Sequence, residues 1–396
     1  FSHPVLSHAT LKASYSLTAD RGPAFVTNSQ TILNSYSPWR PSASVTESGM
    51  RITELENSEL TYEKKHEFNV GVDLGFLHNR INLAADYYRR NNFDLIGVIN
   101  TQGAGGTIAK YANIASMRSS GIELTLSTQN IKKKGFSWNT DFIFSKTKNE
   151  ITDLKSHANV LDLISGNGFG REGYPVRALF SIPFAGLTED GLPTFINQDG
   201  QRTISTLNFQ EYEKLGFLKY EGPTDPTITG SFGNILTYKN FKLNVFLTYS
   251  FGNVIRLDPV FSSAYSDLDA MPKEFKNRWM KAGDENTTNI PTIVSYRMNQ
   301  QYAYLNMAYN AYNYSDVRIA DGGFIRLKEI SLSYDLPAKV LNFFRLNKLQ
   351  FKIQATNLFL LYADSKLNGQ DPEFFRSGGV STPVPRQFTF TIRLGL

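Results

Sequence analysis

Apolar and polar residues alternate strictly in segments of about ten residues, and this feature constrains the fold of the chain more than any other. In residues 66–76, HEFNVGVDLGF, every second residue from Phe68 to Phe76 is apolar. A period of two places successive side chains on opposite faces of a β-strand. Nine further segments show the same pattern: 11–17, 81–88, 121–127, 136–144, 231–238, 241–251, 329–336, 349–355 and 387–396. The chain is therefore predicted to be all-β.

The connections between these segments alternate between short and long. Short links are predicted at 77–80, 130–135, 239–240 and 337–347, and long links at about 20–62, 91–117, 149–229, 252–322 and 360–385. Such alternation puts every long loop on the same side of an antiparallel sheet, as in outer-membrane barrels with tight turns on one side and long extracellular loops on the other. A soluble antiparallel sheet with one buried face is the alternative. The long links favour a transmembrane antiparallel β-barrel.

Charged residues in mid-strand support the barrel, because a charge that faces lipid is costly. Their side chains are expected to face the lumen or a plug, and the apolar side chains between them are expected to face lipid. The last segment, QFTFTIRLGL, follows the same rule and is predicted to be the closing strand. The predicted lumen-facing or plug-facing residues are Glu67, Asp73, Asp86, Glu123, Asp141 and Arg393.

Several function classes find no support in the sequence. No run reaches the roughly 18 consecutive apolar residues that a spanning helix needs. The formal net charge is +5, and the one basic run, Lys132–Lys134, is read as a solvated turn, so no nucleic-acid partner is predicted. The chain has no cysteine, its five histidines show no metal-ligand spacing, and no serine lies in a nucleophile elbow. We predict neither enzymatic activity nor a cofactor.

One segment is rich in tyrosine, asparagine and glutamine: residues 296–314, YRMNQQYAYLNMAYNAYNY. Tyrosine offers a flat apolar face and a polar tip, which suits stacking on sugars or holding a peptide. The alternative is that the rings pack within the loop or against a lid protein. Trp39 is a weaker case of the same kind. The predicted loop contacts with substrate or partner are Trp39, Tyr296, Tyr302, Tyr304, Tyr309, Tyr312 and Tyr314.

The segments in order resemble the C-terminal half of the SusC-type (SusC/RagA-like) TonB-dependent transporters of Bacteroidota. The resemblance rests on six motifs and covers nearly the whole chain. They are YEKKHEFNVGVDLGFLHNRINLAADYYRRNNFDLI (62–96), NIASMRSSGIELTLSTQNIKKKGFSWNTDFIFSKTKNEI (113–151), DPTITGSFGNILTYKNFKLNVFLTYSFGN (225–253), DGGFIRLKEISLSYDLP (321–337), ATNLF (355–359) and GQDPE (369–373). A calcium-like loop of the family is represented here by NQDGQRT, residues 197–203, which has too few carboxylates and is predicted to be an ordinary turn without metal.

The resemblance implies a barrel of about 22 strands with a plugged lumen in the cell outer membrane. Residues 1–396 are then the C-terminal portion of one barrel domain, and the N-terminal plug and first strands are expected to lie in a part of the protein that this chain lacks. The implied partners are TonB, a SusD-like lipoprotein lid, the lipid and lipopolysaccharide of the membrane, and a glycan or peptide ligand. Two functions stay open: TonB-dependent nutrient import, and a structural role for the barrel in a larger outer-membrane complex.

Overall fold

The computed structural model describes residues 5–21, 31–39, 47–54, 56–57, 59–100, 109–266, 268, 271–375 and 385–395. Its largest element is one antiparallel sheet of ten strands in the order β1-β4-β5-β6-β7-β13-β14-β17-β18-β19. Within the described residues, no helix has the length and apolarity that crossing a membrane requires. The strands of the sheet are β1 (Leu6–Asp20), β4 (Glu63–Phe76), β5 (Ile81–Asn100), β6 (Ala109–Lys133), β7 (Phe136–Leu154), β13 (Ile228–Tyr238), β14 (Phe241–Phe251), β17 (Phe324–Asp335), β18 (Lys348–Ala363) and β19 (Gln387–Gly395).

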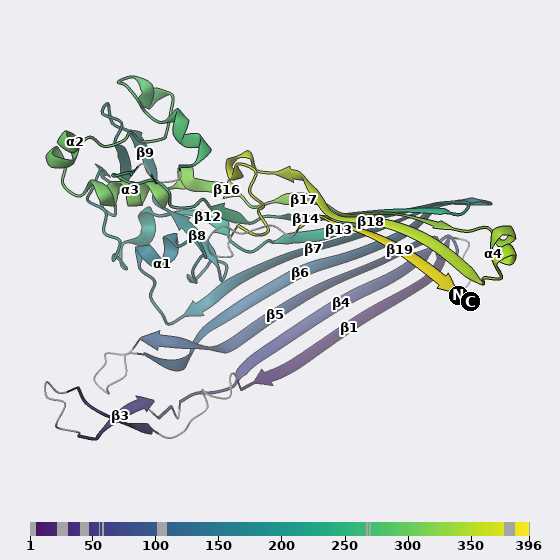
Figure 1. Cartoon of the computed structure of the whole chain (residues 1–396). Helices are drawn as coiled ribbons and strands as arrows, with labels where there is room; N and C mark the ends of the chain where they lie inside the picture. The colour runs from purple at the N-terminus through teal and green to yellow at the C-terminus, as the bar shows by residue number, and fades with distance from the viewer. Residues whose placement is uncertain are drawn as a thin grey trace.

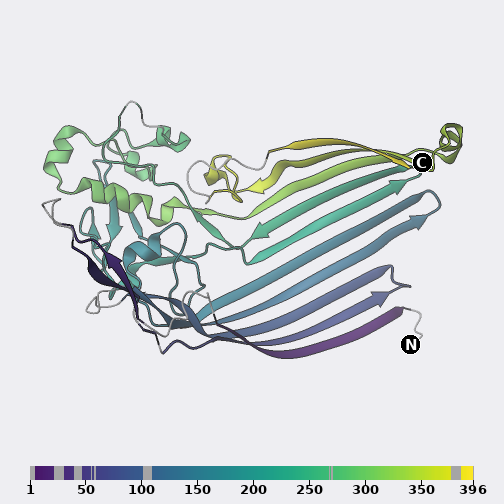
Figure 2. The same cartoon turned by 60° about the horizontal axis from the view of Figure 1, so that its bottom comes forward.

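The two ends of the sheet differ, and we call them the turn end and the loop end. Short connections, both described chain ends and helix α4 (Ala338–Phe344) lie at the turn end, and the long connections lie at the loop end (Figures 1 and 2). The predicted short links at 77–80 and 239–240 are tight turns, and the link at 130–135 is reduced to residues 134–135. The fourth link is not a plain turn, because α4 occupies most of it.

The strands are longer than predicted. β6 has 25 residues and β5 has 20, and together they occupy most of the predicted long link at 91–117. At about 3.3 Å per residue, 25 residues extend roughly 80 Å, well beyond a bilayer core of about 30 Å. Periodicity missed these extensions because their outer halves, such as NNFDLIGVIN in β5, mix apolar and polar residues on both faces and carry no alternating signal.

Cross-strand register keeps each kind of side chain on one face across the whole sheet. One row runs through Val72, Ala85, Leu124 and Phe144, and the adjacent row on the other face runs through Gly71, Asp86, Glu123 and Ser145. Because directly opposed residues share a face, the alternation read from each strand separately becomes one apolar face and one polar face. Ile143 departs from the pattern and lies in the polar row opposite Thr125.

The burial of these faces is the reverse of that in a soluble sheet. In β17, Ser331 and Ser333 are 6% and 8% exposed, whereas Leu332 between them is 45% exposed. The polar face is thus the sheltered one, as expected on the inside of the curved sheet in Figure 2. A soluble sheet would bury leucine and expose serine. This inside-out burial separates the barrel from the soluble alternative.

The long links are not structureless. Residues 155–226 and 252–322 fold together into what we call the loop subdomain, which lies at the loop end (Figure 1). Its core includes Leu163, Phe180, Phe195, Leu305 and Tyr309, all nearly inaccessible to solvent. A separate ribbon forms at the loop end from β2 (Ile32–Tyr36) and β3 (Gly49–Glu54). The subdomain elements are α1 (Val160–Ile164), β8 (Ala178–Ser181), β9 (Phe184–Leu187), β10 (Pro193–Ile196), β11 (Arg202–Thr203), β12 (Lys219–Pro223), β15 (Val254–Arg256), α2 (Tyr296–Gln301), α3 (Leu305–Asn313) and β16 (Ile319–Asp321).

Candidate functional site at the loop end

The tyrosine-rich segment forms two helices instead of the predicted loop. Ser295 caps α2 by accepting a hydrogen bond from the Met298 amide, and α3 follows after a left-handed residue, Tyr304. The buried residues of α3 include Leu305, Ala308, Tyr309 and Tyr312, which recur at helical spacing and pack into the subdomain core. The sequence-based prediction of a loop missed this helix, because a buried stripe made of tyrosine and alanine gives a weak apolar signal; the alternative that rings pack within the segment holds for Tyr309 and Tyr312.

The six tyrosines of this segment consequently divide into two groups. Tyr309 and Tyr312 are 1% and 2% exposed, so their rings belong to the core, and desolvation raises the pKa of both hydroxyls. Tyr314 is also partly buried, with the Arg256 guanidinium 5.6 Å from its ring centre. These three rings are not on an open surface. Tyr296 and Tyr304 are exposed, as is Trp39 after the β2 strand, whereas Tyr302 is half-buried and also packs against the subdomain core.

Tyr302 lines an open groove of about 960 Å³ beside the small β9-β10-β11 sheet. Its hydroxyl donates to the Asp190 carboxylate at 3.4 Å. Most side chains around the groove are polar, and both charges are present. The other lining residues are Leu187, Thr188, Glu189, Thr194, Arg202, Thr203, Ile204, Ser205, Glu285, Asn286, Gln301 and Ala303. Such a surface can accept and donate hydrogen bonds along an extended polar molecule.

Two charged groups of the groove are held in fixed positions. Arg202 donates through Nε to the Thr194 hydroxyl at 2.9 Å and through Nη2 to the Leu187 carbonyl at 3.3 Å. Glu285 accepts from the Trp279 indole at 3.1 Å and from the Gly283 amide at 2.8 Å. Backbone hydrogen bonds, its own amide first, and the Trp279 indole lower the pKa of Glu285. The groove therefore presents a fixed cation and a fixed anion to solvent.

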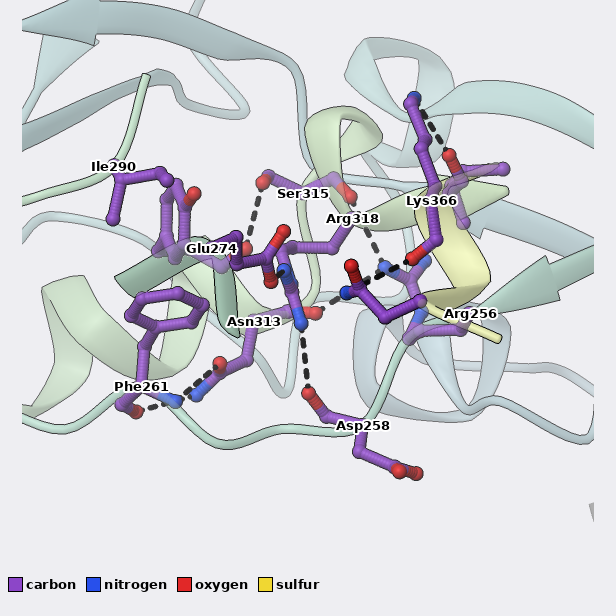
Figure 3. Close-up of polar contacts among 12 residues, drawn as sticks. Arg256, Asp258, Phe261, Glu274, Ile290, Asn313, Ser315, Arg318 and Lys366 are labelled. Atoms are coloured by element: carbon purple, nitrogen blue, oxygen red, sulfur yellow. Dashed lines mark hydrogen bonds and ion pairs between the residues drawn. The ribbon is translucent and has the colours of Figure 1, made fainter. Parts of the chain in front are cut away.

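Two buried arginines, Arg256 and Arg318, lie within the loop subdomain and bond segments that are far apart along the chain (Figure 3). Arg256 Nη2 donates to the Phe180 carbonyl at 2.7 Å and to the Ser181 hydroxyl at 2.9 Å, and Nη1 donates to the Ser315 carbonyl at 3.1 Å. Burial lowers the pKa of Arg256 to about 10, so it stays charged at neutral pH. These bonds join β8 of one long link to the end of α3 in the next.

Arg318 forms the second buried centre of the loop subdomain. It pairs with Glu274, donates to the Asp258 carbonyl at 3.1 Å and lies 4.9 Å from the centre of the Phe261 ring. Lys366, from the last long link, donates to the Ile319 carbonyl at 2.9 Å. No periodicity marks these residues in the sequence, because each acts through a partner far along the chain.

A third arginine explains two of the family motifs. Arg326, in GGFIRLKEI, is buried on the polar face, and its Nη2 lies 2.6 Å from Asp371 and 3.1 Å from Glu373. Both carboxylates belong to the GQDPE motif. The pair fastens the last long link to the inner face of β17. The sequence signal for this ion pair was Arg326 itself, a charged residue within the apolar run FIRL of the strand.

The charges predicted to face the lumen or a plug lie on the polar face of the sheet, where several form hydrogen bonds or ion pairs. Glu67 bonds Lys65 and Arg90, each at 3.1 Å, and Asp73 pairs with Lys12 on β1. Asp141 accepts from the Ser127 hydroxyl at 2.7 Å. That these groups face a plug remains a prediction.

The remaining predicted charges occupy the same face. Asp86 lies across Gly71, where an added Cβ would meet its carboxylate at 2.1 Å, and it is directly opposite Glu123. Glycine at 71 therefore makes room for that carboxylate. Arg393, on the edge strand β19, is opposite Gln350.

The calcium-like run forms the hairpin turn between β10 and β11. Asn197 Oδ1 accepts from the Asp199 and Gln201 amides at 3.1 and 2.9 Å, and the Asp199 carboxylate is 2.8 Å from Lys214 Nζ. Hydrogen bonds within the turn occupy the Asn197 side chain, and the ion pair with Lys214 occupies the Asp199 carboxylate. This is the arrangement of an ordinary turn. Across the described parts of the chain, no group of three or more acidic or histidine side chains could hold a metal ion.

Known proteins resemble the chain at the level of both sequence and fold. No family model matches it. TonB-dependent receptor P3 of Formosa agariphila is 25% identical over 348 residues, which cover 82% of this chain and 32% of the relative. TonB-dependent receptor SusC of Bacteroides thetaiotaomicron is 26% identical over 363 residues, 86% of this chain and 32% of SusC. The chain thus spans about a third of the length of these curated relatives.

A solved structure shares the fold over the whole chain. The RagAB peptide transporter superposes with a TM-score of 0.77 at 22% identity, covering 100% of this chain and 41% of the other. The relatives are receptors and transporters, not enzymes, in agreement with the sequence-based prediction. This chain is thus an outer-membrane β-barrel protein related to the SusC-like TonB-dependent receptors.

Proposed function

We propose that the chain is part of an outer-membrane importer that takes up a nutrient, a glycan or a peptide, with energy delivered through TonB. The observation that carries the proposal is the inside-out sheet, in which Leu332 is exposed between the buried Ser331 and Ser333. Only a barrel with a wet interior and a lipid exterior makes this burial favourable. The similarity to TonB-dependent receptors supports the proposal that this barrel belongs to a TonB-dependent importer.

We assign residues 1–396 to the C-terminal portion of one larger barrel, of about 22 strands around a plug. The matched residues cover only 32% of each of the relatives. In the ten-stranded sheet, β1 and β19 are the two edge strands. An open edge in lipid leaves backbone groups without hydrogen bonds, so pairing of both edges with further strands of the barrel is favoured.

At the loop end, a SusD-like lipoprotein is the proposed lid. The exposed aromatic side chains there suit a protein partner, since tyrosine and tryptophan are enriched at interfaces. Trp39, Tyr296 and Tyr304 are exposed at this end. Lipid and lipopolysaccharide are the proposed surroundings of the apolar face.

The groove around Tyr302 is the proposed contact for the nutrient on its way inward. Its fixed Arg202 and Glu285 groups suit the charges of a peptide, and Tyr302, Gln301 and Asn286 suit the hydroxyls of a glycan. The solved relative is described as a peptide transporter, which makes peptides the first class to test.

The test is uptake of a fluorescent tryptic peptide mixture, and separately of labelled oligosaccharides, by cells that carry the intact gene. Uptake is expected to require both TonB and the gene. Tyr302→Ala is expected to lower apparent affinity roughly threefold to tenfold, the value of one aromatic contact. Tyr212→Ala, at a residue 61% exposed, outside the groove lining and with no proposed role in lid binding, is the matched control.

The alternative is a structural role in a larger outer-membrane complex. Nutrient-dependent growth that survives deletion of the gene, together with loss of other outer-membrane proteins from the same complex, would favour the structural role and contradict import. Equal loss of uptake in the Tyr212 and Tyr302 variants would leave the import proposal standing but would contradict a role of the groove in binding the nutrient.

A further inference from the structure

The turn end of the sheet carries a concentration of positive charge that the proposed import function does not use. The four short links, residues 77–80, 130–135, 239–240 and 336–347, contain no aspartate or glutamate. They contain seven basic residues: Arg80, Lys132, Lys133, Lys134, Lys239, Lys339 and Arg345. The carboxylate next to these links, Asp335, accepts a hydrogen bond from Gln350 at 2.9 Å on the polar face.

Two of the links lie side by side and form the centre of this surface. The Lys239 amide donates to the Gly135 carbonyl at 2.7 Å, which joins the β13–β14 turn to the β6–β7 turn. Lys132, Lys133, Lys134 and Lys239 are all exposed. None of the four takes part in an ion pair with the residues that the structure describes.

A row of aromatic side chains fixes where these lysines lie relative to the membrane. Phe136, Tyr238, Phe241, Tyr334 and Phe351 are opposed one to the next on five neighbouring strands, so all five share the apolar face. Phe241 and Tyr334 are in direct contact, with ring centres 4.5 Å apart. Aromatic rows of this kind mark the level of the lipid headgroups in a barrel.

Two of the lysines belong to the same face as that row. Lys133 is directly opposite Phe136, and the Lys239 ammonium lies 5.3 Å from the centre of the Tyr238 ring. Both ammonium groups therefore lie at the outer limit of the aromatic row, where lipid phosphates are found. A lysine stem can lie along apolar surface while its charge reaches the phosphate layer.

We propose that this surface, Lys132–Lys134 with Lys239, binds the phosphate headgroups of anionic phospholipids in the leaflet at the turn end. Charge complementarity selects the partner, because four ammonium groups that form no ion pair with the described residues favour anionic over zwitterionic headgroups. Helix α4 extends the same surface with Lys339 and with exposed Phe343 (Figure 1). The inference uses the membrane placement of the sheet and does not depend on transport.

The test is native mass spectrometry of the purified, intact protein released from lipid discs made of equal parts phosphatidylglycerol and phosphatidylcholine. Wild-type protein is expected to retain phosphatidylglycerol preferentially. In Lys133→Gln/Lys239→Gln, the preference is expected to fall roughly fivefold for each lysine removed. Lys276→Gln/Lys281→Gln removes the same charge from exposed loop-end residues and is expected to leave the preference unchanged.

Two results would overturn the proposal. The first is a phosphatidylglycerol preference that is the same in wild type and in Lys133→Gln/Lys239→Gln. An equal loss of preference in that variant and in Lys276→Gln/Lys281→Gln would also count against the proposal, because it would indicate only general charge attraction. The second comes from discs in which lipid A is the phosphate source. If the turn-end variant lost lipid A binding but kept phosphatidylglycerol binding, the ligand would be lipopolysaccharide. A variant Lys133→Arg/Lys239→Arg, which keeps the charge, should behave like wild type and guards against misfolding.

Discussion

The sheet and the loop subdomain belong to one chain but bury opposite kinds of side chain. In the subdomain, Leu163, Phe180 and Phe195 are enclosed, as in a water-soluble protein. In the sheet, serines and charged groups are sheltered while leucine, isoleucine and phenylalanine are exposed. This difference in burial indicates that the subdomain is surrounded by water and that the apolar face of the sheet is surrounded by lipid. The subdomain must gain its stability by removing apolar surface from water, whereas the sheet gains it by leaving apolar surface to lipid.

The largest expected effect is in the subdomain. Arg256→Ala would remove a donor from the buried Phe180 carbonyl, from the Ser181 hydroxyl and from the Ser315 carbonyl, which keeps the Arg318 amide, at a cost of about 3–5 kcal/mol to the local structure. Hydrogen exchange should rise in α1, β8 and α3 and stay unchanged in β4 to β7. Arg256→Lys, which keeps charge but loses the planar fork, should fall between wild type and alanine. Equal loosening of the sheet would contradict the idea that the two regions are stabilised separately.

A second comparison tests the faces of the sheet with two adjacent residues. Ile353 is exposed on the apolar face, and Gln354 lies on the polar face opposite Ser331. Ile353→Lys should destabilise the reconstituted barrel by about 2–4 kcal/mol if it lies at mid-bilayer. Gln354→Lys should cost less than about 1 kcal/mol, since the lumen is wet and Glu329 is on the same face.

Denaturant unfolding in lipid bilayers measures both variants. The opposite ranking, with lysine tolerated at 353 and not at 354, is what a soluble sheet would give. That outcome would remove the basis of the membrane assignment.

The smallest effect compares one hydroxyl in each region. Tyr309 donates to the Thr292 carbonyl inside the subdomain core, and Tyr249 crosses Gly230 to donate to the Ile143 carbonyl at 2.8 Å. Tyr309→Phe should cost about 1–2 kcal/mol, because it removes the donor to the buried Thr292 carbonyl. Tyr249→Phe should cost less, about 0.5–1 kcal/mol, because Ile143 is paired with strands on both sides. Local exchange rates at the Thr292 and Ile143 segments report the loss. No change at Tyr249→Phe would indicate that another donor, such as water, reaches that carbonyl.

Much of the sheet could be predicted residue by residue. The alternation located all ten strands of the sheet and the side to which the charges of β4 to β7 point, because a period of two is visible in each strand alone. The lengths of β5 and β6 could not be predicted, since apolar and polar residues do not alternate in their outer halves. The site was predicted less well. Tyr302 lies in the groove, but Tyr309 and Tyr312 belong to the core.

The sequence by itself therefore determined the class of the protein: strands with one apolar face, tight turns on one side, long links on the other, and six motifs of a known family. Only the tertiary structure decided which apolar residues are enclosed and which are exposed. Burial depends on the neighbours that the fold supplies, and the same leucine or tyrosine packs in a core or faces outward accordingly. The tertiary structure also decided that two long links share one core. It brought Arg256, Arg318 and Arg326 to partners that are 44 to 76 residues away along the chain, a distance at which no local pattern marks the contact.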